Sequence, residues 1–173
     1  MTEPEVSLRI AMHYIQSGET VENVSVSIDG AHIKTKDKTH FEMVGFLRGC
    51  GYVKCDCRND TWQGEYQKMN YSQRIVVSSK PGVGDVVVRL NHGKTLYIES
   101  KKFKNGSGGE YPAMREAMGQ LLTGCPEDNI PVVAVPYNDK SAELAERWSH
   151  NSRICNAGIR FMLVHDDGAI DFI

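Results

Sequence analysis

The sequence predicts a single α/β domain built around a mixed central sheet, and three observations lead to this prediction. The 173 residues fit one domain more easily than two, since single domains cluster near about 100 to 150 residues. Hydrophobic residues make up 40% of the chain and charged residues 24%, which excludes a disordered, collagen-like or coiled-coil protein. Segments with helical and with strand periodicity alternate along the centre of the chain, as is typical of α/β folds.

The first part of the chain, residues 1–36, is interpreted as a small extension of the domain. Apolar residues at helical spacing predict a helix over 5–16 that ends near Gly18. Alternating valine and serine predicts a strand over 24–28, and Asp29-Gly30 predicts a hairpin turn that brings the chain back. No catalytic constellation is recognised in this extension.

Residues 37–137 are expected to form the core, and residues 138–173 a C-terminal helix and hairpin. Thr39 and Glu42 have the spacing of a capping box, which predicts that the first core helix begins here and ends near Gly49. The polar stretch 58–74 has no clear period and is interpreted as an insertion. The remaining elements follow from periodicity and turn residues: strands over 52–57, 85–90, 95–101 and 132–135, a helix that starts around Pro112 and ends at Gly124, a helix over 141–150, and a hairpin of 159–164 and 169–173.

Composition also indicates where the protein works. No apolar run approaches the roughly 18 residues that a membrane span needs, and the N-terminus lacks the pattern of a signal peptide. The five cysteines are odd in number and lack the spacing of a disulfide framework, which favours a reducing compartment. The expectation is a cytoplasmic protein that does not interact with a membrane.

The net charge of -2 conceals an uneven distribution of charge. Residues 68–104 contain eight basic and two acidic side chains, a charge of +6, so the rest of the chain carries -8. An anionic ligand prefers such a basic segment. Ordinary solvated lysines explain it equally well, and charge alone does not separate the two interpretations.

Glu99 and Lys101 provide the first sign of a chemical site. Side chains alternate along a strand, so both residues lie on one face of the strand over 95–101, about 6.5 Å apart. A lone Glu-x-Lys in a strand is most often a surface salt pair. The functional interpretation therefore depends on what faces this pair.

Strand pairing supplies the partner. If residues 91–93 form a three-residue hairpin loop with Gly93 in the left-handed conformation, Asp85 lies opposite Glu99 at about 5 Å. Two facing carboxylates repel each other, and a hard divalent cation with oxygen ligands removes the repulsion. Lys101 beside such an ion would orient or deprotonate a water for attack on phosphorus.

These residues resemble a known nuclease pattern. Gly84-Asp85, thirteen intervening residues and Glu99-Ser100-Lys101 are similar to the PD-(D/E)XK nuclease superfamily, and the surrounding elements look most like its Holliday-junction resolvases. The resemblance covers roughly residues 39–137, including Gly51-Tyr52 before the first strand and a Tyr-led helix from Tyr111. It implies a restriction-endonuclease-like core of order αβββαβ, with a mixed central sheet flanked by helices.

Two positions depart from the family pattern. Gly84 stands where the family name has proline. The resolvases carry an acidic metal ligand in the first helix, and counting back from Gly51-Tyr52 gives His40, which is similar to a variant in viral cap-snatching endonucleases that act on RNA. Helical geometry places His40 on the buried face, where it would either bind the metal or bond to a carbonyl in the core, whereas Glu42 is explained as a cap.

The resemblance implies an endonuclease dependent on Mg²⁺ or Mn²⁺ that hydrolyses phosphodiester bonds, with DNA favoured over RNA. Asp85 and Glu99 would bind the metal together with the Ser100 carbonyl and His40, and Lys101 would assist the water. The alternative is a nucleic-acid-binding or assembly module that keeps the fold without turnover, and the sequence leaves open a homodimer or a subunit of a larger complex. Contacts to nucleic acid are expected from Arg74, Lys80, Lys102, Lys104 and Gln120. Gln120 is also explained as an exposed glutamine on a helix, and Lys102 and Lys104 as part of a loop without a function in binding.

Overall fold

The computed structural model of the chain describes residues 1–56, 61–80, 84–103 and 108–173. The strands in chain order are β1 Val24–Ser27, β2 Lys34–Thr35, β3 Lys38–Thr39, β4 Tyr52–Lys54, β5 Gly64–Lys68, β6 Arg74–Ser78, β7 Val86–Arg89, β8 Thr95–Ser100, β9 Ile130–Pro136, β10 Arg160–Val164 and β11 Ile170–Phe172. The helices are α1 Glu3–Ser17, α2 Gly30–Ile33, α3 Met43–Gly49, α4 Glu110–Gly124, α5 Asp139–Ser149 and α6 Ser152–Asn156. Among the described residues, every helix is too short or too polar to cross a membrane.

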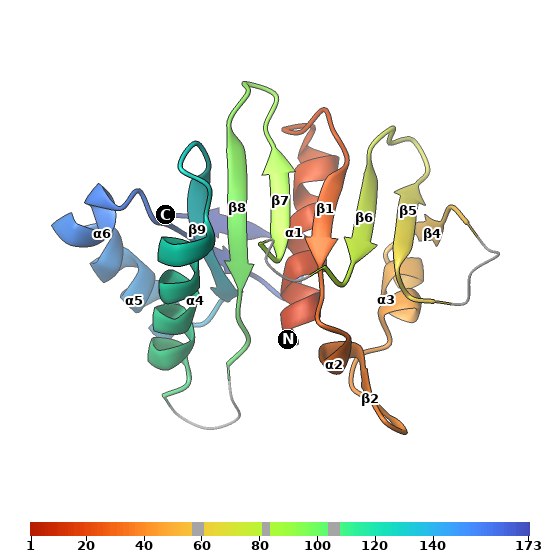
Figure 1. Ribbon diagram of the computed structural model, residues 1–173, viewed down its shortest axis with the longest axis horizontal. Helices are drawn as coiled ribbons and strands as arrows, with labels where there is room; N and C mark the ends of the chain where they lie inside the picture. The colour runs from red at the N-terminus through yellow and green to blue at the C-terminus, as the bar shows by residue number, and fades with distance from the viewer. Residues whose placement is uncertain (57–60, 81–83, 104–107) are drawn as a thin grey trace.

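Nine of the strands form one mixed sheet, with helices on both faces (Figure 1). The sheet order is β11-β10-β9-β8-β7-β1-β6-β5-β4, and β2 and β3 form a separate two-stranded sheet. Strand β9 runs parallel to β8 and β10, whereas β7 runs antiparallel to β8 and to β1. The predicted α/β class with a mixed sheet flanked by helices is therefore confirmed.

The N-terminal segment is an integral part of the fold, and its interpretation as an extension is wrong. Strand β1 lies near the centre of the sheet, between β6 and β7. Val24 and Val26 are fully buried under α1, while the alternating Ser25 and Ser27 face the other side of the sheet. Local periodicity identified the helix and the strand correctly, but it carries no information about which distant strands β1 pairs with.

Two local predictions are also wrong. Asp29-Gly30 does not form a hairpin turn, because the Asp29 carboxylate accepts a hydrogen bond from the amide of Ala31 and caps α2. The capping box at Thr39 is absent, since Thr39 ends β3 and Glu42 precedes α3 without a side-chain cap. The stretch interpreted as an insertion, 58–74, contributes β5, which pairs with both β4 and β6.

Two hydrophobic clusters lie on opposite faces of the sheet. Along β8, Leu96 and Ile98 belong to the cluster under α1 and α3, whereas Tyr97 belongs to the cluster under α4 and α5. Helix α4 packs on β8 and β9 and α5 packs on β10, so these helices cover one half of their face. On that face the described helices do not extend over β7, and a cleft lies at the edge of α4.

The C-terminal half agrees with its sequence pattern. Helix α4 begins near Pro112 and runs to Gly124 as expected, and α5 overlaps the predicted helix over 141–150 and buries Leu144, Ala145 and Trp148. Strands β10 and β11 form the predicted final hairpin. Leu122 of α4 is 65% exposed, whereas Met114, Ala117 and Leu121 of the same helix are buried.

Candidate active site

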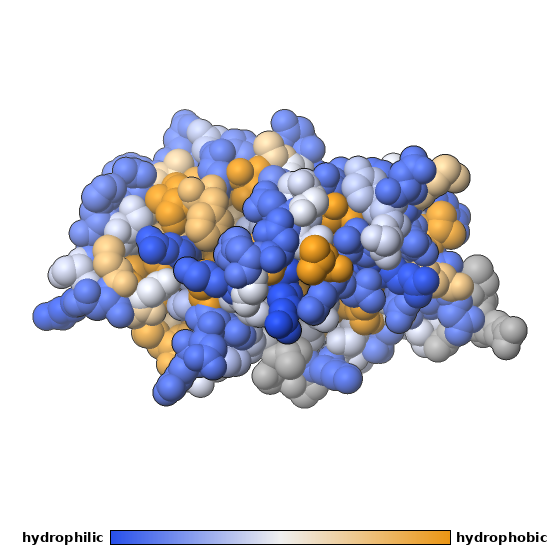
Figure 2. Space-filling view, turned by 90° about the horizontal axis from the view of Figure 1, so that it is seen from above, coloured by the Kyte–Doolittle hydropathy of each residue, from blue (hydrophilic) through white to orange (hydrophobic). Residues whose placement is uncertain are grey.

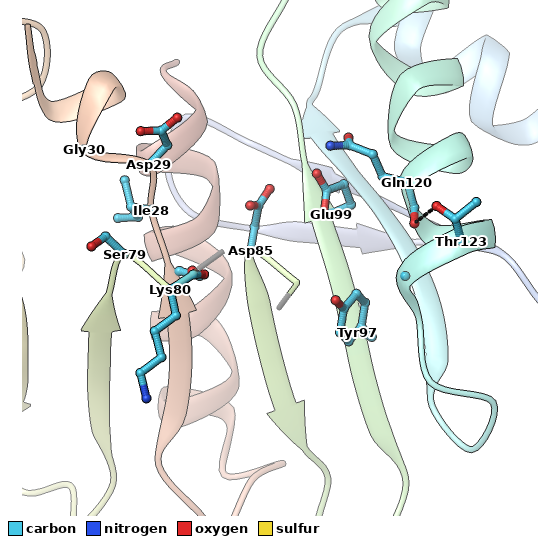
Figure 3. Close-up of a pocket in the computed structure, with 12 residues that line it drawn as sticks. Ile28, Asp29, Gly30, Ser79, Lys80, Asp85, Tyr97, Glu99, Gln120 and Thr123 are labelled. Carbon is cyan, nitrogen blue, oxygen red and sulfur yellow. Dashed lines mark hydrogen bonds between the residues drawn. The ribbon is translucent and has the colours of Figure 1, made fainter. Parts of the chain in front are cut away.

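The hairpin of β7 and β8 brings Asp85 and Glu99 together as the sequence predicts. Its three-residue loop ends at Gly93, which has the expected positive φ of 88°. Val86 pairs with Ile98, so the preceding Asp85 lies across from Glu99 on the face that carries α4. In Figure 3 the two carboxylate groups stand side by side at the same level of the sheet.

Each carboxylate has one strong partner in the protein. The Ser100 amide donates a hydrogen bond of 2.8 Å to Oδ2 of Asp85. Lys101 donates from Nζ to Oε1 of Glu99 at 3.0 Å, and the same ammonium lies 3.5 Å from a carboxylate oxygen of Glu116 on α4. Glu99 and Lys101 are each only 8% exposed, so their charges interact with little screening by water.

The electrostatics of Asp85 show that this carboxyl group holds its proton unusually strongly. Burial, followed by the negative charge of Glu99, raises its pKa from 3.8 to about 8, even though the Ser100 hydrogen bond acts in the opposite direction. Burial also raises the pKa of Glu99, although Lys101 works against this. Two carboxyl groups with raised pKa values that face each other are a site where added positive charge is favourable.

Lys101 is held in its charged form. Burial lowers its pKa, but the hydrogen bond and the charge of Glu99, with those of Glu3 and Asp85, outweigh burial and raise it. The ammonium group is therefore a proton donor and a positive charge in this arrangement. Of the two roles expected for Lys101, orienting a water or deprotonating it, the first agrees with this pKa.

A cleft of about 600 Å³ opens above the two carboxylates. Its floor includes Tyr97 on β8, and one wall is formed by the end of α4, where Gln120 and Thr123 face into it (Figure 3). The opposite wall consists of Asp29 and Lys80, which follow β1 and β6. The cleft is large enough for part of a nucleotide chain, and its walls offer hydroxyl, amide and carboxylate groups.

A third carboxylate approaches the pair from the other side, and the sequence reasoning missed it. Glu3 in the first turn of α1 lines a small cavity of about 40 Å³ together with Asp29, His32 and Asp85. Its charge raises the pKa of both Asp85 and Glu99, and His32 lies 3.5 Å from one of its oxygens. The sequence does contain one indication of Glu3: it is an acidic residue in the helix that directly precedes a strand of the sheet.

His40 does not have the environment that the sequence predicted. It is exposed and lies between β3 and α3, outside any helix, with its backbone amide bonded to the Ile33 carbonyl at 2.8 Å. It lines neither of the two cavities beside Asp85. The prediction placed His40 in the first turn of a helix, but α3 begins only at Met43, so His40 has no helical face.

The other predicted contact residues are scattered. Lys80 lines the cleft, with its ammonium group directed away from the carboxylates (Figure 3). Arg74 forms an ion pair with Glu65 and does not line the cleft. Lys102 is exposed and lies two residues beyond the end of β8, and Lys104 lies outside the described residues.

The described basic residues of segment 68–104 do not form one surface. Lys68 lies over the ring of Tyr52 at 5.7 Å and borders a separate cavity with Arg9 of α1. Arg89 is the last residue of β7 and lies 3.4 Å from Glu22. It is about 10 Å along the strand from Val86, the end of β7 that adjoins Asp85. Hydrophilic residues cover much of the face seen in Figure 2, with separate apolar patches between them.

The donor set at the site suits a hard divalent cation. Asp85 and Glu99 offer carboxylate oxygens, Ser100 offers a backbone carbonyl, and Glu3 adds negative charge at close range, which is the chemistry that Mg²⁺ and Mn²⁺ prefer. Within the described ranges, however, no three His, Cys, Asp or Glu side chains are already arranged as a metal-binding group.

No protein-family model matches this chain, and neither a curated protein nor a solved structure matches it. The class of protein follows from the fold and the site alone: an α/β protein with facing carboxylates and a lysine in a cleft at one end of its central strands.

Proposed function

We propose that the protein is a divalent-metal-dependent nuclease that hydrolyses phosphodiester bonds at the Asp85 and Glu99 pair. The observation that carries this proposal is the facing of two carboxyl groups with raised pKa values, beside a charged lysine and in a cleft. A divalent ion would relieve their repulsion, and its remaining coordination positions would accept phosphate oxygens. DNA is favoured over RNA, in line with the resemblance to the resolvases.

The order of elements supports the restriction-endonuclease-like core, with different members from those that the sequence suggested. Helix α1, strands β1, β7 and β8, helix α4 and strand β9 follow the order αβββαβ, and the segment from α2 to β6 is inserted between the first two strands. In this assignment Glu3 takes the place of the acidic residue in the first helix. His40 is then not needed as a ligand.

The residues of this chain would divide the chemistry as follows. Asp85, Glu99 and the Ser100 carbonyl would hold Mg²⁺ or Mn²⁺, with Glu3 adding charge from α1. The bound ion supplies positive charge that acidifies a water and stabilises the phosphate in the transition state. Lys101, held protonated by Glu99 and Glu116, would donate a hydrogen bond to the water or the phosphate and keep it in place.

A nucleic-acid-binding module without turnover is the second candidate. The observation that favours it is the lack, among the described residues, of a preformed metal-binding group. Both candidates predict binding in the cleft, but they differ in whether metal and these carboxylates produce cleavage.

Cleavage of single-stranded, duplex and branched DNA and of RNA in Mn²⁺ tests the proposal directly. We expect the wild-type protein to cut at least one of these substrates. Asp85→Asn, Glu99→Gln and Lys101→Met should each lower the rate by about a hundredfold or more, since removal of one well-placed catalytic group typically has such an effect. Lys94→Met, at the exposed turn of the same hairpin, is the matched control and should cut like the wild type.

Two outcomes would contradict the proposal. Cleavage by all three site variants at the wild-type rate would place the chemistry elsewhere or assign it to a contaminant. Metal-dependent binding of the oligonucleotides by the wild-type protein without cleavage of any substrate would favour the binding module.

A further inference from the structure

Gly84 lies against the ring of Tyr97 so closely that no side chain fits there. A Cβ atom at Gly84 would stand 2.9, 3.0 and 3.1 Å from Cε1, Cδ1 and Cζ of Tyr97. Carbon atoms prefer about 3.5 Å or more, so the ring or the backbone would have to move by about 0.5 Å. The φ of Gly84 is not in the left-handed region, so contact with the ring, and not backbone conformation, requires glycine here.

The ring of Tyr97 has little freedom to move away. Tyr97 is 8% exposed and belongs to the cluster under α4 that includes Ala117 and Leu121. Its hydroxyl lies 3.9 Å from where a Cβ at Gly124 would stand, at the end of α4. The ring is thus held between the backbone before β7 and the end of α4, and a tightly packed interior resists displacement.

Asp85 follows Gly84 directly, so this contact limits where its carboxylate can lie. Val86 fixes the other side of Asp85, because it pairs with Ile98 in the sheet. Between these two constraints the carboxylate reaches the Ser100 amide at 2.8 Å. A displacement of about 0.5 Å is comparable with the tolerance within which functional side chains must be held.

We propose that Tyr97 is a positioning residue whose ring seats the backbone of Gly84 and thereby fixes the carboxylate of Asp85 against the Ser100 amide. This role accounts for glycine at the position where the motif of the resembling family has proline. The geometric part of the proposal is independent of turnover, whereas its consequence for metal binding rests on the proposed function.

A double-mutant cycle of Gly84→Ala and Tyr97→Val tests the contact, since valine removes all three ring atoms that a Cβ would meet. Two readouts are followed in each variant: the NMR resonance and hydrogen exchange of the Ser100 amide, and the dissociation constant for Mn²⁺ by calorimetry. Tyr97→Phe keeps the ring and removes only the hydroxyl. Gly119→Ala is the matched glycine control, because a Cβ there meets nothing within 4 Å.

We expect Gly84→Ala to shift the Ser100 resonance, to speed its exchange and to weaken Mn²⁺ binding by about tenfold or more, as loss of a positioning contact at a metal site typically does. In the Tyr97→Val background the same alanine should change neither readout further, because the ring it would strike is absent. Gly119→Ala should match the wild-type protein in both readouts. Tyr97→Phe keeps the ring but loses the hydrogen bond between the hydroxyl and the Gly84 backbone, so its change in each readout should be smaller than that of Gly84→Ala.

The proposal is overturned if Gly84→Ala leaves the Ser100 amide unchanged, or if alanine has the same effect in both backgrounds. If Gly84→Ala does not fold, the folding of the double variant decides. A double variant that folds as well as the single variant Tyr97→Val does supports the contact. A double variant that does not fold, although Tyr97→Val folds, contradicts it. A wild-type protein that binds no Mn²⁺ would count against the proposed function, while the Ser100 amide would still decide the positioning role.

Discussion

Replacement of Asp85 by asparagine should make the metal-free protein more stable at neutral and alkaline pH. Asparagine keeps an oxygen that can accept the hydrogen bond from Ser100 but carries no charge. The pKa of Asp85 is about 8 in the folded protein against 3.8 for the ordinary side chain. Between these two values the folded state binds one proton more than the unfolded state, so the free energy of unfolding of the wild-type protein falls as pH rises.

The size of the effect follows from the width of this window. Each pH unit costs about 1.4 kcal/mol, and roughly four units separate the two pKa values, so the loss is at most about 6 kcal/mol. Glu99 titrates together with Asp85 and will take part of this loss. Even a third of it, about 2 kcal/mol, is a large fraction of the total stability of about 5 to 15 kcal/mol of an ordinary domain.

Urea unfolding of the wild-type protein and of Asp85→Asn at pH 5, 6, 7 and 8, in the presence of EDTA, measures this directly. We expect the advantage of the variant to grow steadily across the series. Asp128→Asn, the same replacement at an exposed carboxylate, is the control and should follow the wild-type profile. A difference between wild type and Asp85→Asn that stays constant from pH 5 to pH 8 would refute the argument that Asp85 is protonated in the folded state.

Three further predictions follow from the geometry of the site. Glu3→Gln removes a charge that acts on the carboxylate pair, so it should raise the free energy of unfolding in EDTA by about 1 kcal/mol and weaken Mn²⁺ binding in calorimetry; unchanged values would separate Glu3 from the site. His40→Ala should leave Mn²⁺ affinity within about twofold, and a loss as large as that of Asp85→Asn would return His40 to the ligands. The cleft is lined by Asp29, Asp85 and Glu99 but only one described lysine, so a bound cation should reduce its repulsion of nucleic acid. We therefore expect the Lys101→Met protein to bind a fluorescent oligonucleotide about tenfold more tightly in Ca²⁺ than in EDTA. Equal affinities would place the nucleic acid on another surface.

The pairing of Asp85 with Glu99 could be predicted from the sequence because it depends on local features. A short loop with a left-handed Gly93 sets the register of two strands that are adjacent in the chain, and the period of two then decides which side chains face each other. The same local logic explains why the predicted helices around Pro112 and Leu144 are close to those observed.

The place of β1 and the contribution of Glu3 depended on contacts that no local pattern encodes. Strand β1 pairs with Ser78 and Val86, which follow it by some fifty to sixty residues, and an alternating valine and serine pattern suits a central strand and an edge hairpin equally well. Once β1 is central, α1 becomes the helix against the site and brings Glu3 toward Asp85, while α3, which carried the expectation for His40, packs against the edge strand β4. Periodicity in the sequence thus determined many of the elements and one hairpin register. Long-range strand pairing, which depends on how buried faces fit together in three dimensions, decided which helix lies against the site.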